Sequence, residues 1–224
     1  MLRSAGYGTL SYNFRGQVNS NFLSSRELTP ELIVEDLIYL LSKTKPNRPI
    51  LVGLSIGGLF AAQAVLKGID GAGLVLINTL RRPNLRLDWI NEVTSVAFGL
   101  GGAALLKDMM LPMLVNPQTL SEMRKEAFAS DIYTPTLKTD GHANLMRNAV
   151  LANWDFPWSS LQVPILVMTG MHDRVFLIED DVNEMLKSMQ NATHVKFENA
   201  GHLLPMEIPK EFSDELSRFL ATQL

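Results

Sequence analysis

The stretch from Ile50 to Leu66 constrains the fold more than any other part of the sequence. It begins with three apolar, strand-prone residues, continues through the turn Gly53-Leu54-Ser55-Ile56-Gly57, and ends in an apolar, Ala-rich segment that favours a helix. A Gly-x-Ser-x-Gly turn between a strand and a helix is typical of a serine held on a strained backbone at the tip of a sharp turn. The pattern predicts that Ser55 is a nucleophile at the carboxyl end of a strand in a parallel sheet.

The glycines and the helix start around Ser55 fit this interpretation. We expect the sharp turn to leave no room for a Cβ atom at Gly53 or Gly57, and we expect Gly58 to let the helix pack closely against the strand. Backbone N–H groups at the helix N-terminus, that of Ile56 among them, favour negative charge that develops beside Ser55. The motif by itself leaves open an ordinary serine in a glycine-rich loop.

Composition excludes several classes of function. The 224 residues suffice for one domain with an inserted subdomain, and the net charge of −3 argues against nucleic acid as the main partner. The absence of cysteine excludes disulfides and thiolate catalysis. The first residues lack the apolar core of a signal peptide, and the longest apolar stretch, Val93 to Leu106, is too short to span a bilayer. We therefore expect a cytoplasmic protein without a membrane span.

Strand and helix signals alternate in both halves of the chain, which predicts an α/β fold with a doubly wound, mostly parallel sheet. We expect strands at Tyr7–Phe14, Ile50–Val52, Leu74–Ile77, Val163–Thr169 and His194–Glu198. We expect helices that begin at Pro30, with Thr29 as N-cap, and at Leu59, Asp180 and Pro209.

The alternation stops between Thr79 and about Leu161, where the sequence predicts several helices without a strand. We interpret residues 79–161 as a helical lid inserted into a core formed by residues 1–78 and 162–224. Its apolar side chains line a pocket for a small apolar, ester-like substrate or form the lid's own core, and we favour the second interpretation. These residues are Phe98, Leu100, Leu105, Leu106, Met109, Met110, Leu111 and Met113.

Three arginines open this segment: Arg81, Arg82 and Arg86. They are candidates for contact with a substrate carboxylate, but we favour solvated surface charges.

Candidate partners for Ser55 follow later strands. A serine hydroxyl needs an imidazole as base, and the imidazole needs an orienting carboxylate. Asp173 lies four residues past the strand that ends at Thr169, and His202 lies four residues past the strand that ends at Glu198. In a parallel sheet such positions meet at one edge. A turn-forming role for Asp173 and a structural loop role for His202 are the alternatives.

The other polar residues favour no second site. Asn78 follows the strand Leu74–Ile77. Some proteins with a serine nucleophile on a parallel sheet carry the orienting carboxylate there, but Asn78 offers none. The side chain of His172 is expected to point away from Asp173, His142 to lie in a solvated loop, and His194 to begin a strand. The four histidines lack metal-ligand spacing, so we expect no metal.

Three segments together resemble the α/β-hydrolase fold superfamily, in its serine hydrolase branch. They are Gly53-Leu54-Ser55-Ile56-Gly57-Gly58, the run from Pro164 to Asp173, and Ala200-Gly201-His202-Leu203-Leu204-Pro205. The resemblance covers nearly the whole chain and implies the triad Ser55, Asp173 and His202. A serine at position 55 argues against the dehalogenase and epoxide hydrolase branches, which use Asp there.

The sequence departs from this family at its beginning. Gly6-Tyr7 and the run from Asn13 to Ser20 are similar to the fourth-strand segment of the family, with Asn13, Gln17 and Val18 where Asp, His and Gly are usual. In the family, three strands and a helix precede that segment, and the loop after the third strand donates one of two oxyanion N–H groups. We therefore expect an N-terminally truncated form of the fold, with the Ile56 N–H as the remaining oxyanion donor.

The resemblance implies a serine hydrolase that cleaves a carboxylic ester, a lactone or a related acyl compound without a cofactor. A C–C bond hydrolase or a perhydrolase with the same triad is an alternative. A non-catalytic protein of this fold is another, because the oxyanion loop is missing. The oligomeric state is left open.

Overall fold

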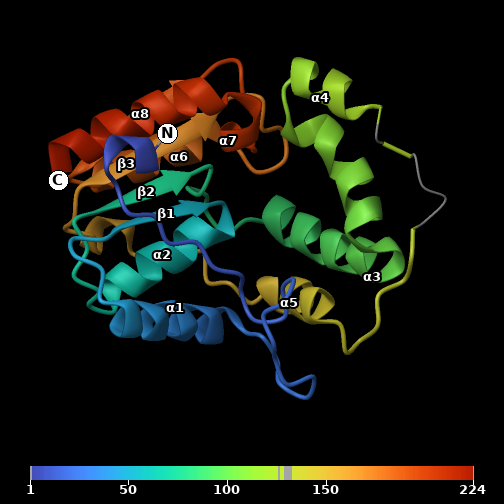
Figure 1. Cartoon of the computed structure of the whole chain (residues 1–224). Helices are drawn as coiled ribbons and strands as arrows, with labels where there is room; N and C mark the ends of the chain where they lie inside the picture. Colours follow the sequence, from blue (N-terminus) through green and yellow to red (C-terminus); the bar gives the residue numbers. More distant parts are fainter. Residues whose placement is uncertain (1, 126, 129–132, 224) are drawn as a thin grey trace.

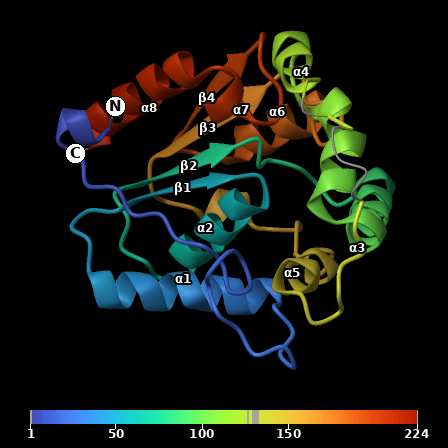
Figure 2. The ribbon, with the colours of Figure 1, turned by 45° about the vertical axis from the view of Figure 1, so that its right-hand side comes forward.

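Four parallel strands form the centre of the computed structural model, which describes residues 2–125, 127, 128 and 133–223. The strands are β1 (Ile50–Leu54), β2 (Gly73–Ile77), β3 (Ile165–Gly170) and β4 (Ala192–Phe197), and they lie in the order β1-β2-β3-β4. In register, Leu51 is opposite Leu74, and Leu74 is opposite Ile165. The predicted parallel sheet is confirmed, and the carboxyl ends of β1 and β2 face the side of the molecule where α3 lies (Figure 2).

Helices cover both faces of the sheet, as Figure 1 shows. Every residue of β2 is buried, because its alternate side chains enter two different cores. Leu74 and Leu76 join the core that contains α1 (Pro30–Thr44), α2 (Ile56–Leu66) and α6 (Glu179–Ser188). Val75 and Ile77 join the opposite core with α8 (Pro209–Gln223). The doubly wound arrangement follows from this alternation.

Helix α1 begins where the sequence predicts. The Thr29 hydroxyl accepts a hydrogen bond from the Leu32 N–H at 3.4 Å, and Pro30 occupies the first helical position, where no N–H is needed. The helix ends at Lys45, which has a positive φ of 45°.

The segment 79–161 contains helices and no strand among its described residues. Its elements are α3 (Leu85–Leu114), α4 (Pro117–Met123), α5 (Gly141–Ala149) and the 3₁₀ turn η2 (Trp158–Ser160). Helix α3 bends sharply at Gly102, whose φ of 63° and ψ of −160° suit only glycine. Helices α3 and α4 stand beyond the carboxyl ends of the strands (Figures 1 and 2), whereas η2 leads back to the start of β3. Its role as a lid, and the domain boundaries at 78 and 162, stay predictions.

Helix α3 divides its apolar residues between the interior and the surface. Phe98, Met110 and Leu111 are buried, whereas Leu100, Met109 and Met113 are exposed. Within the described residues, α3 is the one helix long and apolar enough to cross a membrane by length and composition. It is a weak indication of a span, because the helix is bent at Gly102 and packs against α5.

The segment Tyr7–Phe14 is not a strand, contrary to the prediction. Residues 8–13 are exposed and pair with none of the described strands. A strand without a partner has too few hydrogen bonds to be stable. The described part of the sheet thus ends at β1, where the Val52 side chain is 49% exposed. The expectation of an N-terminally truncated fold stays a prediction.

The glycines of the Ser55 turn differ in how closely they are packed. A Cβ atom on Gly53 would lie 2.3 Å from the Gly58 nitrogen, and one on Gly58 would lie 2.0 Å from the Thr79 hydroxyl. A Cβ atom on Gly57 would meet nothing within 4 Å outside its own helix. The expectation for Gly53 and Gly58 is confirmed. The expectation for Gly57 is wrong, because its backbone lies against Gly53 but a Cβ atom on it would point into open space.

We expect Gly53→Ala and Gly57→Ala to differ in stability. Alanine at position 53 collides with backbone atoms that cannot move aside, so we expect a loss of about 1–3 kcal/mol in the free energy of unfolding. Alanine at position 57 enters open space in a helix, where it costs nothing and gains up to about 1 kcal/mol. Urea unfolding of the two variants measures this difference, and equal losses would contradict the packing described above.

Candidate active site

Ser55 lies on a strained backbone between β1 and α2. Its φ of 54° and ψ of −124° are unusual for a residue with a side chain and cost on the order of 1–3 kcal/mol. The Ser55 N–H donates to the Ile77 carbonyl at 2.8 Å, and the Thr79 hydroxyl donates to the Ser55 carbonyl at 3.0 Å. The end of β2 therefore holds the turn that presents Ser55 at the start of α2.

Asp173 and His202 form a buried hydrogen-bonded pair. Asp173 is 4% exposed and His202 is 6% exposed, and the distance from Asp173 Oδ2 to His202 Nδ1 is 2.6 Å. The other carboxylate oxygen accepts the N–H groups of Val175 and Phe176 at 3.0 and 2.9 Å. With Nδ1 bonded to the carboxylate, the Nε2 atom of His202 is the one left for proton transfer.

Two opposing effects act on the Asp173 carboxyl group. Burial raises its pKa, but the hydrogen bond and charge interaction with His202 and the N–H groups of Phe176 and Val175 outweigh burial. The pKa of Asp173 therefore lies below its ordinary value, and the carboxylate stays ionised at neutral pH.

The Asn78 side chain binds the loops that carry this pair. Its Nδ2 donates to the carbonyls of Gly201 and His202 at 3.0 and 2.9 Å, and its Oδ1 accepts the Gly170 N–H at 2.8 Å. The His202 N–H in turn donates to the carbonyl of Leu114, at the end of α3, at 2.6 Å. Asn78 offers no carboxylate, but its side-chain amide connects the ends of β2 and β3 with the loop that carries His202.

Glu207, in the short helix α7 (Leu204–Glu207), binds the same loop from the other side. Its carboxylate accepts the N–H groups of Gly201 at 2.9 Å, Leu203 at 2.9 Å and Asn116 at 2.7 Å. The first two flank His202, and the third lies just past α3. Glu207 is not among the residues predicted from the sequence. No short motif marks it, because its three partners come from distant positions.

Arg81 lies inside the site rather than on the surface, so the sequence-based expectation for it is wrong. It is 5% exposed, and its Nη2 atom donates to the Ser55 hydroxyl at 2.8 Å. The guanidinium carbon lies 4.3 Å from the centre of the Trp154 ring and 4.4 Å from that of Phe176. Arg81 follows the end of β2 by four residues, so the rule that found Asp173 and His202 also finds it when applied to cations.

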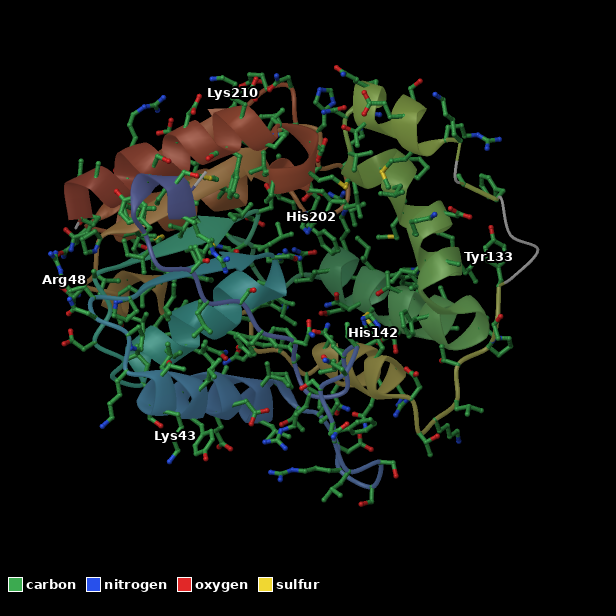
Figure 3. All side chains as sticks on the ribbon, in the orientation of Figure 1. Lys43, Arg48, Tyr133, His142, His202 and Lys210 are labelled. Carbon is green, nitrogen blue, oxygen red and sulfur yellow. The ribbon has the colours of Figure 1, made fainter. Side chains whose placement is uncertain are left out.

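The structure brings Ser55, Asp173 and His202 to the carboxyl edge of the sheet, but it does not join all three by hydrogen bonds. Asp173 contacts His202, whereas the Ser55 hydroxyl is bonded to Arg81. Among the described residues, no hydrogen bond links Ser55 to His202. In Figure 3, His202 lies between the sheet and α3, and Tyr133 lies on the outer side of α3. Ile56 begins α2 next to Ser55, so its N–H has no acceptor in the preceding turn of a helix.

The other candidate residues make no hydrogen bond with the described parts of Ser55, Asp173 or His202. Arg82 and Arg86 are exposed, as expected, although Arg86 donates to the Arg174 carbonyl. His142 is exposed but lies in α5 rather than in a loop, with its ring 5.1 Å from that of Phe98. His194 lies within β4 and contacts the Thr169 hydroxyl at 3.0 Å.

Possible metal ligands do not cluster in the described part of the chain. No group of three or more His, Asp or Glu side chains there has the arrangement to hold an ion. The expectation that the protein uses no metal stays a prediction.

These features are those of a known group of enzymes. The model of the alpha/beta hydrolase family matches residues 1–215, and the chain therefore belongs to that family. No curated protein is similar enough in sequence to count as a match.

Solved structures agree on the fold. A thermophilic esterase from Thermogutta terrifontis superimposes with a TM-score of 0.77 at 23% identity, over 94% of this chain and 78% of the esterase. An alpha/beta hydrolase enzyme from a Medee basin deep-sea metagenome library gives 0.77 at 24% identity, with 94% and 78% covered. The enol-lactonase from Burkholderia xenovorans LB400 gives 0.76 at 23% identity, with 94% and 79% covered. At these identities the likeness shows the α/β-hydrolase fold alone.

We expect Glu207→Gln to loosen the His202 loop. A neutral amide presents one oxygen where the carboxylate presents two, so at least one N–H loses its acceptor, at a cost of about 1–3 kcal/mol. Urea unfolding measures the loss. Glu211→Gln is the matched control, because Glu211 is exposed at the start of α8. Equal stability of both variants would contradict the role given to Glu207.

We expect the stabilising effect of Asp173 to disappear in acid. Because the folded-state pKa is depressed, the contribution is complete above the unfolded-state pKa of about 3.9. It is lost as the pH falls through the lower, folded-state value. The difference in unfolding free energy between wild type and Asp173→Asn should therefore be constant at neutral pH and shrink below about pH 4. Urea titrations at several pH values test this, and a difference that grows in acid would contradict it.

Proposed function

We propose that this protein is a serine hydrolase that cleaves carboxylic esters, lactones or related acyl compounds through a covalent acyl-enzyme. The observation that carries the proposal is the buried Asp173–His202 pair, 2.6 Å apart, at the same sheet edge as the strained Ser55. A carboxylate–imidazole pair of this kind turns an adjacent serine hydroxyl into a nucleophile. The names of two structural neighbours, an esterase and an enol-lactonase, support an ester or lactone substrate.

In the proposed mechanism, Ser55 Oγ attacks the substrate carbonyl carbon while His202 Nε2 removes the hydroxyl proton. The Asp173 carboxylate holds the ring and stabilises the imidazolium, and the Ile56 N–H donates to the oxyanion. His202 then gives its proton to the leaving alcohol as the tetrahedral intermediate collapses to the acyl-enzyme. Water, activated by His202, releases the acid and regenerates Ser55.

One movement is required before attack. The Ser55 hydroxyl must exchange its hydrogen bond with Arg81 for one with His202. Rotation about the Cα–Cβ bond of Ser55 would redirect the Oγ atom while Ile77 and Thr79 hold the backbone of the turn.

The helical segment 79–161 is the proposed lid. Its helix α3 stands beyond the carboxyl ends of the strands, and both ends of α3 are attached to the loops of the site. Leu114 accepts the His202 N–H, and Arg86 donates to Arg174, next to Asp173. The exposed side chains of Leu100, Met109 and Met113 offer apolar surface for the acyl or alcohol part of a substrate. A C–C bond hydrolase or a perhydrolase would use the same triad and lid.

A non-catalytic protein of this fold is the second candidate. The observation that favours it is the hydrogen bond from Arg81 to Ser55, which occupies the nucleophile in place of His202.

A fluorophosphonate probe, which reacts with activated serines, separates the two candidates. We expect wild type to be labelled and Ser55→Ala not to be labelled. Ser42→Ala is the matched control, because Ser42 is exposed in α1. We expect Asp173→Asn to react about 10⁴-fold more slowly, because the amide no longer holds the imidazole in the required tautomer. A folded wild type that resists the probe would support the non-catalytic candidate.

A further inference from the structure

Arg81 is a buried cation that forms no ion pair with the described residues. Its hydrogen bonds go to uncharged oxygens: the Ser55 hydroxyl at 2.8 Å, the Asn78 carbonyl at 3.0 Å and the Thr79 carbonyl at 3.4 Å. None of the described carboxylates lies within ion-pair distance of it. Burial of a charge is costly unless the charge is paired. The protein therefore maintains a positive charge beside its nucleophile at the expense of stability.

Two aromatic rings hold the guanidinium in one orientation. Trp154 and Phe176 both lie within 4.5 Å of its carbon atom, and cation–π attraction offsets part of the burial cost. Burial lowers the pKa of Arg81 to about 10, against the opposing effect of the Asp173 carboxylate. The group thus stays charged at neutral pH. A rigid, charged, planar group of this kind is prepared to bind an anion.

The donors of Arg81 are not all used. Its Nη1 atom donates to none of the described residues, and one of the two bonds of Nη2 is the one to Ser55. That bond is lost when the Ser55 hydroxyl turns toward His202 for attack. Parallel donors on Nη1 and Nη2 then match the two oxygens of a carboxylate.

We propose that Arg81 binds a carboxylate of the substrate and thereby selects acyl compounds that carry a negative charge a few bonds from the scissile carbonyl, such as half-esters of dicarboxylic acids. The short distance from Nη2 to Ser55 Oγ sets this limit, because Ser55 Oγ bonds to the carbonyl carbon itself. Binding of the carboxylate also draws the Arg81 donor away from Ser55. The substrate therefore frees the nucleophile that Arg81 holds in its absence. This inference rests on the proposed function.

Two stable esters that differ in one group test the selectivity. Monoethyl succinate carries a carboxylate where ethyl butyrate carries a methyl group, and proton release follows the hydrolysis of both. We expect wild type to prefer monoethyl succinate in kcat/KM by at least about tenfold. Arg81→Met, which keeps an apolar side chain between the two rings, should lose about 100-fold on the half-ester and much less on ethyl butyrate.

Arg82→Met is the matched control, because Arg82 is the neighbouring arginine and is exposed. It should keep the preference of wild type. Arg81→Lys should lie between wild type and Arg81→Met, because lysine keeps the charge but not the paired donors. Equal losses on both esters in Arg81→Met would overturn the inference and would assign Arg81 to the nucleophile alone.

Two measurements keep the test independent of turnover and of the folding of Arg81→Met. In wild type, succinate should protect Ser55 from the fluorophosphonate probe at concentrations at which butyramide does not. In calorimetry, Ser55→Ala should bind monoethyl succinate more tightly than ethyl butyrate. Equal protection and equal binding would overturn the inference.

The failures of the two proposals are distinguishable. A wild type that resists the probe and hydrolyses neither ester contradicts the proposed function, while calorimetry still decides whether Arg81 binds the carboxylate. A wild type that is labelled and hydrolyses both esters equally well keeps the proposed function and contradicts only the role of Arg81.

Discussion

The hydrogen bonds of the Asn78 side chain are the interaction on which the site depends most. This one amide joins the end of β2 to the end of β3 and to the backbone carbonyls of Gly201 and His202. A parallel sheet brings its strand ends to one edge, but the loops beyond those ends are free to diverge. Asn78 removes that freedom, and a bond from His202 to α3 extends the same network to the helical segment.

Charge at this edge is arranged in a small volume from which water is largely excluded. Asp173 holds His202, and Glu207 holds the backbone that flanks His202. Arg81 lies against two aromatic rings and forms no ion pair with the described residues. Interactions between charges are strong in such surroundings, so each group influences the others. In the same surroundings, a buried arginine without an ion pair is costly.

Local patterns predicted much of this protein because each depends on a few neighbouring residues. The strand–turn–helix around Ser55, the Thr29 cap and the alternation of buried strands with helices were all readable in this way. Two predictions that depended on distant neighbours were wrong. Tyr7–Phe14 has strand-like residues but no partner among the described strands, and Arg81 has a surface-like composition but is enclosed by Trp154 and Phe176.

The sequence by itself determined the family, the fold class and the identity of the residues that lie beyond the strand ends, because strand order and spacing place them at one edge. Only the tertiary structure decided which of those residues touch. In that structure Asp173 contacts His202, Arg81 donates to the Ser55 hydroxyl, and Glu207 binds the loop of His202. These contacts link positions far apart in the chain, and their distances depend on how helices and loops pack, which no local pattern records.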